Sequence, residues 1–330
     1  MTTPAPGTPS WTRPLGATGT TLTAVCVGGS PLGSVPRLFG REVSADEGVA
    51  TARAVLESPI RCLDTSNGYS DGESERRIGA AIAQVGGLPE DFVVMTKVDP
   101  RGEDYSGDRV RASVEESRAR LGLDRLPLVH LHDPESFDLD EIAAPGGAVD
   151  ALVALRESGA IGSIGLAGGR VQEMARYLEL DVFDVLLVHN RWTLLDRSAR
   201  DLLDEATARG MGIVNAAVYG GGILAAPASA TGSGDRPATY GYRPAPPEIF
   251  DAVAAMRRAC AERGTDLRTA ALQFSVRDDR FATTVVGLSR PERIAQTLAA
   301  TSAQLPDDLW DELESLLPPE RVWLDAPFDR

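Results

Sequence analysis

Short apolar runs alternate with amphipathic segments along nearly the whole chain. The runs have the length of buried strands, and the segments between them repeat apolar residues at the spacing of a helix. The pattern predicts strands at 22–27, 60–63, 92–98, 128–131, 161–166, 185–188, 212–217 and 283–286. It predicts helices at 45–57, 73–85, 107–121, 148–158, 171–178, 198–209, 247–263 and 291–300. Strands that alternate with helices imply parallel pairing, and eight of them favour an α/β fold closed into a (β/α)8 TIM barrel over a doubly wound open sheet.

Three segments add to a bare barrel. Residues 13–22 contain a Gly-bearing turn and predict an N-terminal β-hairpin before the first barrel strand. Residues 225–247 are rich in Gly, Pro, Ala, Ser and Thr, and so long a loop in a compact domain is usually functional or mobile. An extra C-terminal helix is predicted at 306–317, where two acidic residues suit the first turn. We expect a disordered tail over 1–12 and one barrel domain over 13–330.

The charge and cysteine content argue against several classes of partner. Lys and Arg number 33 against 48 Asp and Glu, so a net charge of −15 opposes binding to nucleic acid or anionic membrane. Cys26, Cys62 and Cys260 are too few and too scattered for a disulfide framework. No apolar run is long enough to span a bilayer, and the N-terminus lacks the layout of a signal peptide. We expect a cytoplasmic protein that binds a small-molecule substrate, and a homodimer is compatible with the sequence.

Four side chains with complementary acid–base chemistry stand at or just after the ends of successive predicted strands. Asp64, Lys97 and His132 each lie at a strand end, and Tyr69 lies on the loop after the first of these strands. In a barrel, catalytic groups collect at the C-terminal ends of strands. Taken singly, each residue can instead have a purely structural role. Asp64 can cap the next segment, Tyr69 can pack in its loop, and Lys97 and His132 can be solvated or hydrogen-bonded loop residues. Their corresponding positions favour one active site.

These groups can move a proton, but none of them can supply a hydride. Tyr69 would donate a proton to a carbonyl oxygen, or accept one from a hydroxyl in the reverse direction. Lys97, paired with Asp64, would lower the pKa of the phenol, and His132 would hydrogen-bond the substrate oxygen and orient it. An oxidoreductase built on them needs a nicotinamide cofactor, NADP or NAD. No Gly-x-Gly-x-x-Gly turn follows the first predicted strand, so no strong Rossmann fingerprint is present.

Together these motifs resemble the aldo-keto reductase superfamily. The similarity rests on Asp64-Thr65-Ser66-x-x-Tyr69, Gly72-x-Ser74-Glu75, Thr96-Lys97 and Leu131-His132-Asp133-Pro134. It extends from the predicted hairpin to the helix after Arg293. The resemblance implies a (β/α)8 barrel that binds NAD(P)H in extended form without a Rossmann fold. It also implies a catalytic tetrad of Asp64, Tyr69, Lys97 and His132.

Two further stretches resemble one subgroup of this family. Residues 28–33 with Leu38-Phe39, and residues 238–246, are similar to aldose 1-dehydrogenases of fucose, galactose or arabinose and to a pyridoxal dehydrogenase. The resemblance implies oxidation of the sugar C1 hydroxyl to a lactone, with Tyr69 as the base. A general aldehyde or ketone reductase and a non-catalytic binding module are the alternatives. The intact tetrad argues against the binding module, because binding alone does not need a tuned phenol.

The resemblance also indicates where the cofactor would bind. Asn190 stands where many family members place a Gln on the nicotinamide carboxamide, and Arg293 matches an arginine used on the 2′-phosphate or adenine. Thr297 stands where an adenine-binding Asn is common, and Arg290 can replace a lysine that is missing near the eighth strand. Residues 287–293 can cradle a phosphate at a helix N-terminus. The expected cofactor-binding residues are Gly29, Ser30, Asn190, Gly220, Gly222, Gly287, Leu288, Ser289, Arg293 and Thr297.

Departures from the family pattern lie on the later strands. The fifth predicted strand ends in Ala167-Gly168 rather than Ser-Asn, which weakens the expected hold on the carboxamide. The aromatic residue that stacks on the nicotinamide is replaced near Ala216 or Ala217, and Tyr219 or Trp192 would have to take its place.

The remaining candidates concern the substrate. Trp192, Tyr240 and Tyr242 are expected to form walls of the substrate pocket, with core or loop packing as the alternative. His189, at the end of the sixth predicted strand, can touch substrate. His130 is expected to point away from the site and to be a satisfied core histidine. Three histidines and three cysteines at these spacings form no metal set.

Overall fold

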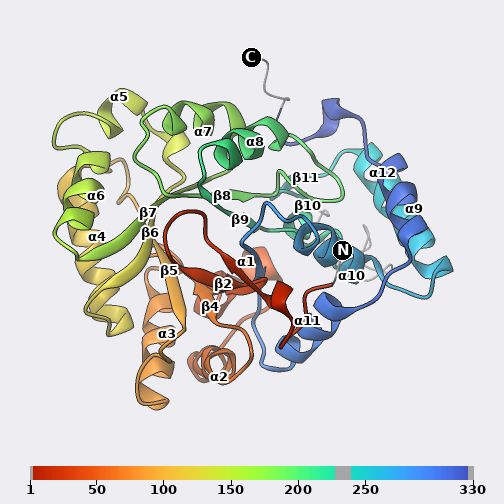
Figure 1. Cartoon of the computed structure of the whole chain (residues 1–330), viewed down its shortest axis with the longest axis horizontal. Helices are drawn as coiled ribbons and strands as arrows, with labels where there is room; N and C mark the ends of the chain where they lie inside the picture. The colour runs from red at the N-terminus through yellow and green to blue at the C-terminus, as the bar shows by residue number, and fades with distance from the viewer. Residues whose placement is uncertain (1–2, 227–238, 326–330) are drawn as a thin grey trace.

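A closed barrel of eight parallel strands forms the centre of the computed structural model, which describes residues 3–226 and 239–325 (Figure 1). The strands follow one another round the barrel in the order β12-β3-β4-β5-β6-β7-β8-β9. Their bounds are β3 (Val25–Gly28), β4 (Cys62–Asp64), β5 (Val93–Val98), β6 (Leu126–His132), β7 (Ile161–Gly168), β8 (Val185–His189), β9 (Gly212–Ala216) and β12 (Thr283–Gly287). The predicted (β/α)8 barrel is confirmed, because β12 pairs with both β9 and β3 and leaves no open edge.

Helices surround this barrel on the outside (Figure 1). Those expected from the apolar periodicity are α2 (Ala45–Leu56), α3 (Glu73–Gln84), α4 (Gly107–Leu121), α6 (Ala148–Glu157), α7 (Val171–Leu178), α8 (Arg200–Ala208), α9 (Pro247–Glu262), α11 (Glu292–Ser302) and α12 (Asp307–Ser315). The short helices α1 (Pro36–Phe39) and α5 (Leu139–Ile142), and the longer α10 (Leu267–Val276), were not expected.

The apolar periodicity did not predict helix α10, because this helix is buried on most sides. Seven of its ten residues are buried, so it lacks the polar face that identifies a surface helix. Its start was nevertheless marked in the sequence, because Asp266 is an N-cap whose side chain accepts a hydrogen bond from the Thr269 amide at 2.8 Å.

The N-terminal hairpin closes one end of the barrel. Strands β1 (Thr12–Pro14) and β2 (Thr21–Thr23) pair antiparallel, as predicted, and lie across the middle of the barrel in Figure 1. Leu15 and Leu22 pack into the apolar cluster that fills the barrel interior. The same cluster contains Cys26, Cys62, Val93, Met95, Leu128, Ala167, Val185, Leu187, Val214, Ala282 and Val285. The hairpin therefore seals the N-terminal end of the strands, and the C-terminal ends remain for a site.

The ends of the chain differ from expectation at one point. Residues Pro9–Trp11 form a 3-10 helix, although 1–12 was expected to be a disordered tail. Trp11 is buried in the main core and donates a hydrogen bond from Nε1 to the Pro59 carbonyl at 3.2 Å, which orders this segment. Most of the expected loop 225–247 lies outside the described residues; its end forms the hairpin β10 (Thr239–Tyr240) and β11 (Arg243–Pro244). Within the described ranges, no helix is both long and apolar enough to cross a membrane.

Candidate active site

The four acid–base residues expected from the sequence meet at the C-terminal end of the barrel. Asp64 ends β4, Lys97 lies near the end of β5, His132 ends β6, and Tyr69 lies on the loop between β4 and α3. The Lys97 ammonium donates to both Asp64 carboxylate oxygens at 2.8 Å and to the Tyr69 hydroxyl at 3.3 Å. It also donates to the Thr65 carbonyl at 2.7 Å, so its donors are fully used.

Burial and the neighbouring groups together determine the protonation of Tyr69 and Lys97. Burial raises the pKa of Tyr69 well above its usual value, and the lowering effect of the Lys97 charge is smaller. The Lys97 charge and hydrogen bond lower the pKa of the phenol, as expected, whereas Asp64 raises it and burial outweighs the effect of Lys97. Burial lowers the pKa of Lys97, but Asp64 and Tyr69 outweigh it and the net pKa is raised. At neutral pH the site thus holds a neutral phenol beside a charged ammonium.

His132 is hydrogen-bonded to Asp99, which lies just beyond the end of β5. The Asp99 carboxylate accepts from Nδ1 of His132 at 2.6 Å. Its other oxygen accepts from the Ser66 hydroxyl and from the Gly68 amide, the latter at 2.7 Å. Because Gly68 immediately precedes Tyr69, one carboxylate holds both the imidazole and the loop that carries the phenol.

Asp133 and His189 extend the polar side of the site outward. Asp133 is in the left-handed region at φ 44°, a conformation that a non-Gly residue adopts only where its surroundings impose it. Its carboxylate lies 3.8 Å from Nε2 of His132 and 3.6 Å from Nε2 of His189. The sequence indicated His189 as a substrate contact, and the structure places it in the cavity wall.

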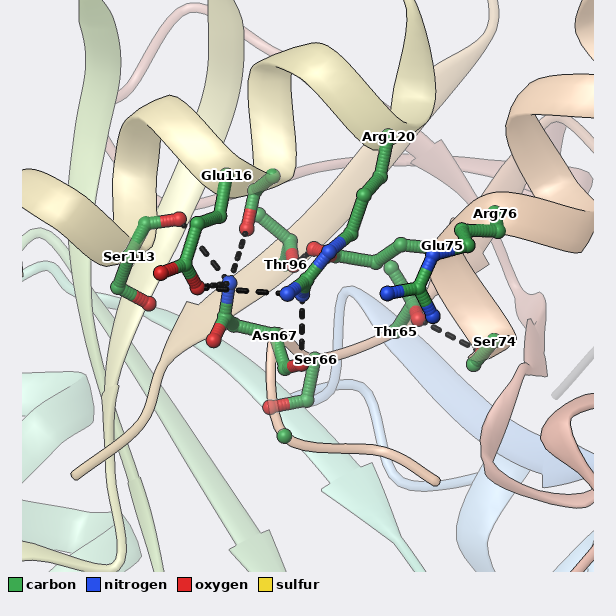
Figure 2. Close-up of polar contacts among 12 residues, drawn as sticks. Thr65, Ser66, Asn67, Ser74, Glu75, Arg76, Thr96, Ser113, Glu116 and Arg120 are labelled. Carbon is green, nitrogen blue, oxygen red and sulfur yellow. Dashed lines mark hydrogen bonds and ion pairs between the residues drawn. The ribbon is translucent and has the colours of Figure 1, made fainter. Parts of the chain in front are cut away.

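A largely buried polar network joins Asn67, on the loop that leads to Tyr69, to side chains of α3 and α4 (Figure 2). Asn67 donates to the Ser113 carbonyl and to the Glu116 carboxylate, each at 3.1 Å. The Arg120 guanidinium donates to the Asn67 carbonyl at 2.9 Å and to Glu75 at 3.1 Å. Glu75 has no exposed side-chain surface, and burial raises its pKa against the lowering effect of its hydrogen bonds. The loop backbone is therefore fixed by charged groups on α3 and α4.

The tetrad opens into a cavity of about 540 Å³. On the side of β7, β8, β9 and β12 its wall consists mainly of small or apolar residues. Leu38, Phe39 and Tyr242 also line the cavity, and each exposes more than a third of its surface. The complete lining is Gly28, Ser30, Pro31, Leu38, Phe39, Asp64, Tyr69, Lys97, His132, Asp133, Ala167, Leu187, His189, Ala216, Ala217, Tyr219, Gly221, Gly222, Tyr242, Val285 and Gly287.

Only part of the expected cofactor set lines this cavity. Ser30, Gly222 and Gly287 do. Gly29 lies behind the wall, where an added Cβ would come within 3.0 Å of Ser74 and Asp64 atoms, and Gly220 packs against the Tyr240 ring. The other expected residues outside the lining are Asn190, Leu288, Ser289, Arg293 and Thr297.

Three of these residues are buried and lie outside the lining of the cavity, so their role in cofactor binding stays a prediction. Leu288 packs in the main core, and Thr297 lies on the buried face of α11. Asn190 has no exposed surface, has a left-handed backbone at φ 63°, and its amide nitrogen lies 3.2 Å from Nδ1 of His189.

Two of the three expected substrate walls lie outside the lining of this cavity. Trp192 packs against Phe274 with ring centroids 6.0 Å apart and belongs to the main core. Tyr240 is buried in a second core cluster and donates to the Asp196 carboxylate at 2.8 Å. Trp192 and Tyr240 are therefore bulky side chains packed in the core, whereas Tyr242 lines the cavity. Of the two proposed substitutes for the stacking aromatic, Tyr219 lines the cavity and Trp192 does not.

His130 is buried and does not line the cavity, as expected, but it does not lie on the opposite face of β6 from His132. Residues two apart on a strand share a face, so His130 lies on the same side of β6 as Leu128 and His132. Its ring covers Gly165 on β7, where an added Cβ would overlap the imidazole. Neither ring nitrogen has a partner among the described residues, so His130 is also not satisfied. Burial lowers its pKa, and Lys97 and His132 lower it further, so the ring is neutral.

A cluster of arginines lies at the start of α11 and on the neighbouring α10. Arg293 donates to the Gln296 side chain at 2.8 Å, and Arg268 approaches the same oxygen at 3.5 Å. The Arg268 guanidinium also lies over the Tyr219 ring, 5.8 Å from its centroid. Desolvation, then Arg268 and Arg290, lower the pKa of Arg293. Among the residues that the structure describes, no carboxylate forms an ion pair with these three arginines, so the cluster fits an anion such as a nucleotide phosphate.

The sequence interpretation missed Asp99, Asp133 and Arg268. Asp99 is two positions after Lys97 and Asp133 directly follows His132, so both could have been found by extending the strand ends by one or two residues. Arg268 lies on the helix that was not predicted. Within residues 3–226 and 239–325, no three His, Cys, Asp or Glu side chains gather closely enough to hold a metal ion.

Comparisons with known proteins agree with this geometry. Residues 24–318 match the model of the aldo/keto reductase family. The chain is 32% identical to a D-threo-aldose 1-dehydrogenase of a Pseudomonas species, over 90% of this chain and 94% of that protein. It is 31% identical to an L-galactose dehydrogenase of Arabidopsis thaliana, with 93% and 94% covered. It is 30% identical to a pyridoxal 4-dehydrogenase of Microbacterium luteolum, with 92% and 96% covered.

Solved structures share the fold. An aldo-keto reductase of Bacillus halodurans in its holo form superposes with a TM-score of 0.77 at 21% identity, covering 97% of this chain and 98% of that chain. A glycerol dehydrogenase of Gluconobacter oxydans superposes with a TM-score of 0.72 at 21% identity, covering 98% of each chain. The barrel, the site at its C-terminal end and the family match lead to one conclusion: the chain belongs to the aldo/keto reductase family and is an NAD(P)-dependent oxidoreductase.

Proposed function

We propose that this enzyme transfers hydride between a nicotinamide cofactor and C1 of an aldose, oxidising the C1 hydroxyl so that a lactone forms. The observation that carries the proposal is the Tyr69 hydroxyl, 3.3 Å from the Lys97 ammonium, with His132 beside it in the wall of one cavity. The similarity to an aldose and a galactose dehydrogenase over nearly the whole chain supports a sugar as substrate.

Each residue of the tetrad has a distinct role in this proposal. Tyr69, a neutral phenol, donates a hydrogen bond to the substrate oxygen, and in the direction of reduction it donates the proton. Lys97 polarises the phenol and is itself held by Asp64 at 2.8 Å. His132 contacts the same substrate oxygen from the other side, which fixes its position for hydride transfer at the adjacent carbon.

The cofactor would accept or give the hydride, and the residues present fit it. Ser30, Gly222 and Gly287 leave room along one side of the cavity, and Tyr219 presents a ring there. Arg268, whose guanidinium lies over the Tyr219 ring, forms with Arg290 and Arg293 a cationic cluster without a carboxylate partner in the described chain. We propose that this cluster binds the 2′-phosphate of NADP, and that NAD is accepted more weakly.

The polar side of the cavity supports a substrate with several hydroxyl groups. Asp133 and His189 line both the main cavity and a second hollow of about 380 Å³. That hollow is also lined by Arg170, Arg191 and Arg243. Carboxylate, imidazole and guanidinium groups together offer the mixture of acceptors and donors that sugar hydroxyls require.

A specific observation favours one second candidate, an aromatic alcohol or aldehyde such as pyridoxal. Leu38, Phe39 and Tyr242 are the large apolar side chains that the described surface exposes most, and all three lie at this cavity. Such a rim suits a flat apolar ring better than a sugar. The similarity to a pyridoxal 4-dehydrogenase supports the same alternative.

A substrate panel tests these proposals. NAD(P)H formation would be followed with L-fucose, D-arabinose, D-galactose and pyridoxal, each with NAD and with NADP, and NADPH consumption would be followed with small aromatic aldehydes. We expect the highest kcat/KM with an aldose and NADP. Turnover of pyridoxal or aromatic aldehydes alone would replace the aldose proposal with the second candidate or with a general reductase.

A further inference from the structure

The segment 320–325 packs against two sides of the second hollow. Gly241, in the turn of the β10–β11 hairpin, lines the hollow, and an added Cβ there would overlap the Leu324 side chain. On another side, the Asp325 carboxylate accepts a hydrogen bond from Nε of Arg191 at 3.1 Å, and Arg191 also lines the hollow. Leu324 and Asp325 therefore hold together two parts of the hollow that lie far apart in the sequence.

A buried carboxylate fixes the hairpin to this segment. Asp196, which has no exposed surface, accepts from the Tyr240 hydroxyl at 2.8 Å and, with the same oxygen, from the Leu324 amide at 2.9 Å. Its other oxygen accepts from the Ser198 hydroxyl at 2.6 Å and from the Ser198 amide at 2.8 Å. The hairpin, the segment 320–325 and the loop between β8 and α8 thus meet at one carboxylate. Because Tyr240 directly precedes Gly241, this contact sets the position of the hairpin against the hollow.

Asp325 also determines what Arg191 offers to the hollow. Its carboxylate accepts from Nε of Arg191 and from the Val171 amide, each at 3.1 Å. Nη1 of Arg191 approaches the His189 carbonyl at 3.4 Å. Nη2 has no hydrogen-bond partner in the part of the chain that the structure describes, although the residue is only 5% exposed. The guanidinium is therefore held in place with one nitrogen left to donate to a ligand in the hollow.

His189 presents an N–H group at the border between the hollow and the main cavity. The side-chain amide nitrogen of Asn190 lies 3.2 Å from Nδ1 of His189. An amide nitrogen only donates, so Nδ1 accepts, and in the neutral ring Nε2 carries the proton. Nε2 lies 3.6 Å from the Asp133 carboxylate, and His189 and Asp133 line both the hollow and the main cavity. A donor and an acceptor therefore lie side by side where the hollow meets the cavity.

We propose that the second hollow binds substrate hydroxyl groups remote from the reacting carbon, and that Leu324 and Asp325 are positioning residues that assemble it. The inference rests on the proposed aldose oxidation and deepens it by assigning where the rest of the sugar binds. A hydroxyl group both donates and accepts hydrogen bonds. Arg191 and His189 supply donors, and Asp133 supplies an acceptor. Because the hollow shares part of its wall with the cavity of the tetrad, one sugar contacts both.

The charge of the hollow favours hydroxyl groups over an anion. Of its three arginines, Arg191 is paired with Asp325 at 3.1 Å and Arg170 with Glu173 at 3.5 Å. Arg243 has no carboxylate partner among the described residues, but the lining also includes two carboxylates of its own. Positive and negative charges are therefore nearly balanced, which suits neutral polar groups.

The first test compares two substrates in Asp325→Ala. This variant removes the acceptor of Arg191 Nε, and we expect KM for the best aldose of the panel to rise about tenfold, as expected for the loss of a hydrogen bond to a charged group. The change in kcat should be smaller, because the contacts of the tetrad are kept. A small aromatic aldehyde without hydroxyl groups, reduced with NADPH, is the reference. The ratio of kcat/KM for the aldose to kcat/KM for the aldehyde should fall about tenfold, and an unchanged ratio would overturn the proposal.

Two further variants separate this role from a general effect on stability. Asp325→Asn keeps an oxygen for Arg191 Nε and should recover part of the aldose KM. Arg321→Ala is the matched control, because it removes an exposed ion pair with Glu248 at 3.1 Å in the same segment and lies outside the lining of the hollow. It should leave the ratio within about twofold of the wild type. An equal fall of the ratio in Arg321→Ala and Asp325→Ala would show that the effect is not specific to the hollow, and the proposal would be wrong.

Leu324→Ala keeps the proposal testable if Asp325→Ala does not fold. It removes the side chain that packs against Gly241 and should lower the same ratio. An aldose that is oxidised with an unchanged ratio in these variants overturns the assignment of the hollow alone. If the wild type oxidises no aldose, the proposed function fails, and the assignment of the hollow to sugar hydroxyls fails with it.

Discussion

The two halves of the cavity wall are built from opposite kinds of residue. The half formed by the ends of β4, β5 and β6 presents Asp64, Lys97 and His132, each with a hydrogen-bond partner at or below 3.3 Å. The half formed by β7, β9 and β12 presents Ala167, Ala216 and Gly287, which offer no side-chain hydrogen bond.

This difference follows from what each half has to do. Charged groups keep a fixed geometry only where other groups satisfy them, so the polar half needs support behind it, such as the network of Asn67, Glu75 and Arg120 (Figure 2). The small half needs no such support, because under the proposed function its contribution is space for a flat cofactor ring. Substitutions in the polar half should therefore act on chemistry and stability, and substitutions near the small half on cofactor binding.

The largest expected effect is that of Tyr69→Phe. Removing the hydroxyl deletes the group that hydrogen-bonds the substrate oxygen in the transition state, and we expect kcat to fall by about 10²- to 10⁴-fold. The measurement is NAD(P)H formation with the best substrate of the panel.

Tyr240→Phe is the matched control for this variant. Tyr240 is also a buried tyrosine bonded to a charged group, Asp196, but it lies outside the cavity. It should lose about 1.5–3 kcal/mol of unfolding free energy and retain its activity. Equal turnover in wild type and Tyr69→Phe would remove Tyr69 from the chemistry.

Asp64→Asn should have the next largest effect, on stability as well as on turnover. It leaves the Lys97 ammonium buried without its charge partner, and breaking such a pair costs about 3–5 kcal/mol of unfolding free energy. Chemical denaturation at pH 7 measures this. Asp204→Asn removes an exposed partner of Arg280 and should cost less than about 1 kcal/mol. Similar losses of unfolding free energy in Asp64→Asn and Asp204→Asn would show that burial does not make the ion pair of the polar half more important than an exposed one.

The same contrast explains how much the sequence could predict. Asp64, Lys97 and His132 are polar residues that interrupt or end apolar runs, and parallel strands bring such ends to one edge, so their meeting followed from the pattern. Glycine and alanine give no comparable indication. Gly28 lines the cavity, whereas its neighbour Gly29 packs behind the cavity wall. The sequence contains no feature that distinguishes these two positions.

Large aromatic residues were also ambiguous, for a physical reason. Trp192 and Tyr240 have polar atoms and flank the later strands, but the area that they bury favours the core. Asn190 illustrates another limit, because nothing in the sequence indicates that this polar side chain is fully buried. The cytoplasmic location, the homodimer and the domain bounds stay predictions.

Asn67→Ala tests whether the network behind the Tyr69 loop supports the polar half. The substitution removes a side-chain amide that donates to Ser113 and Glu116 at 3.1 Å, and it leaves both acceptors without this donor. We expect a loss of about 1–3 kcal/mol in unfolding free energy and a lower kcat, because the loop that carries Tyr69 is less fixed.

The control for this variant is Arg76→Ala, which lies in the same view. Arg76 forms an exposed ion pair with Glu73 at 2.8 Å, and such pairs contribute at most about 1 kcal/mol. Thermal unfolding and kcat should be nearly unchanged. If Asn67→Ala weakens stability but leaves kcat intact, the network stabilises the fold without positioning the phenol.

The smallest expected effect concerns the preference between NADP and NAD, which we assign to the arginine cluster outside the cavity wall. Arg268→Gln should raise KM for NADP by about tenfold, because a hydrogen bond to a charged group contributes about 1.5 kcal/mol or more. KM for NAD, which has no 2′-phosphate, should stay within about twofold and is the internal control. Arg293→Gln should act in the same direction, since Arg268 and Arg293 approach the same Gln296 oxygen and lie in one cluster. Equal changes in KM for both nucleotides would mean that the cluster binds the shared part of the cofactor. In that case the preference for NADP would have to arise elsewhere in the wall.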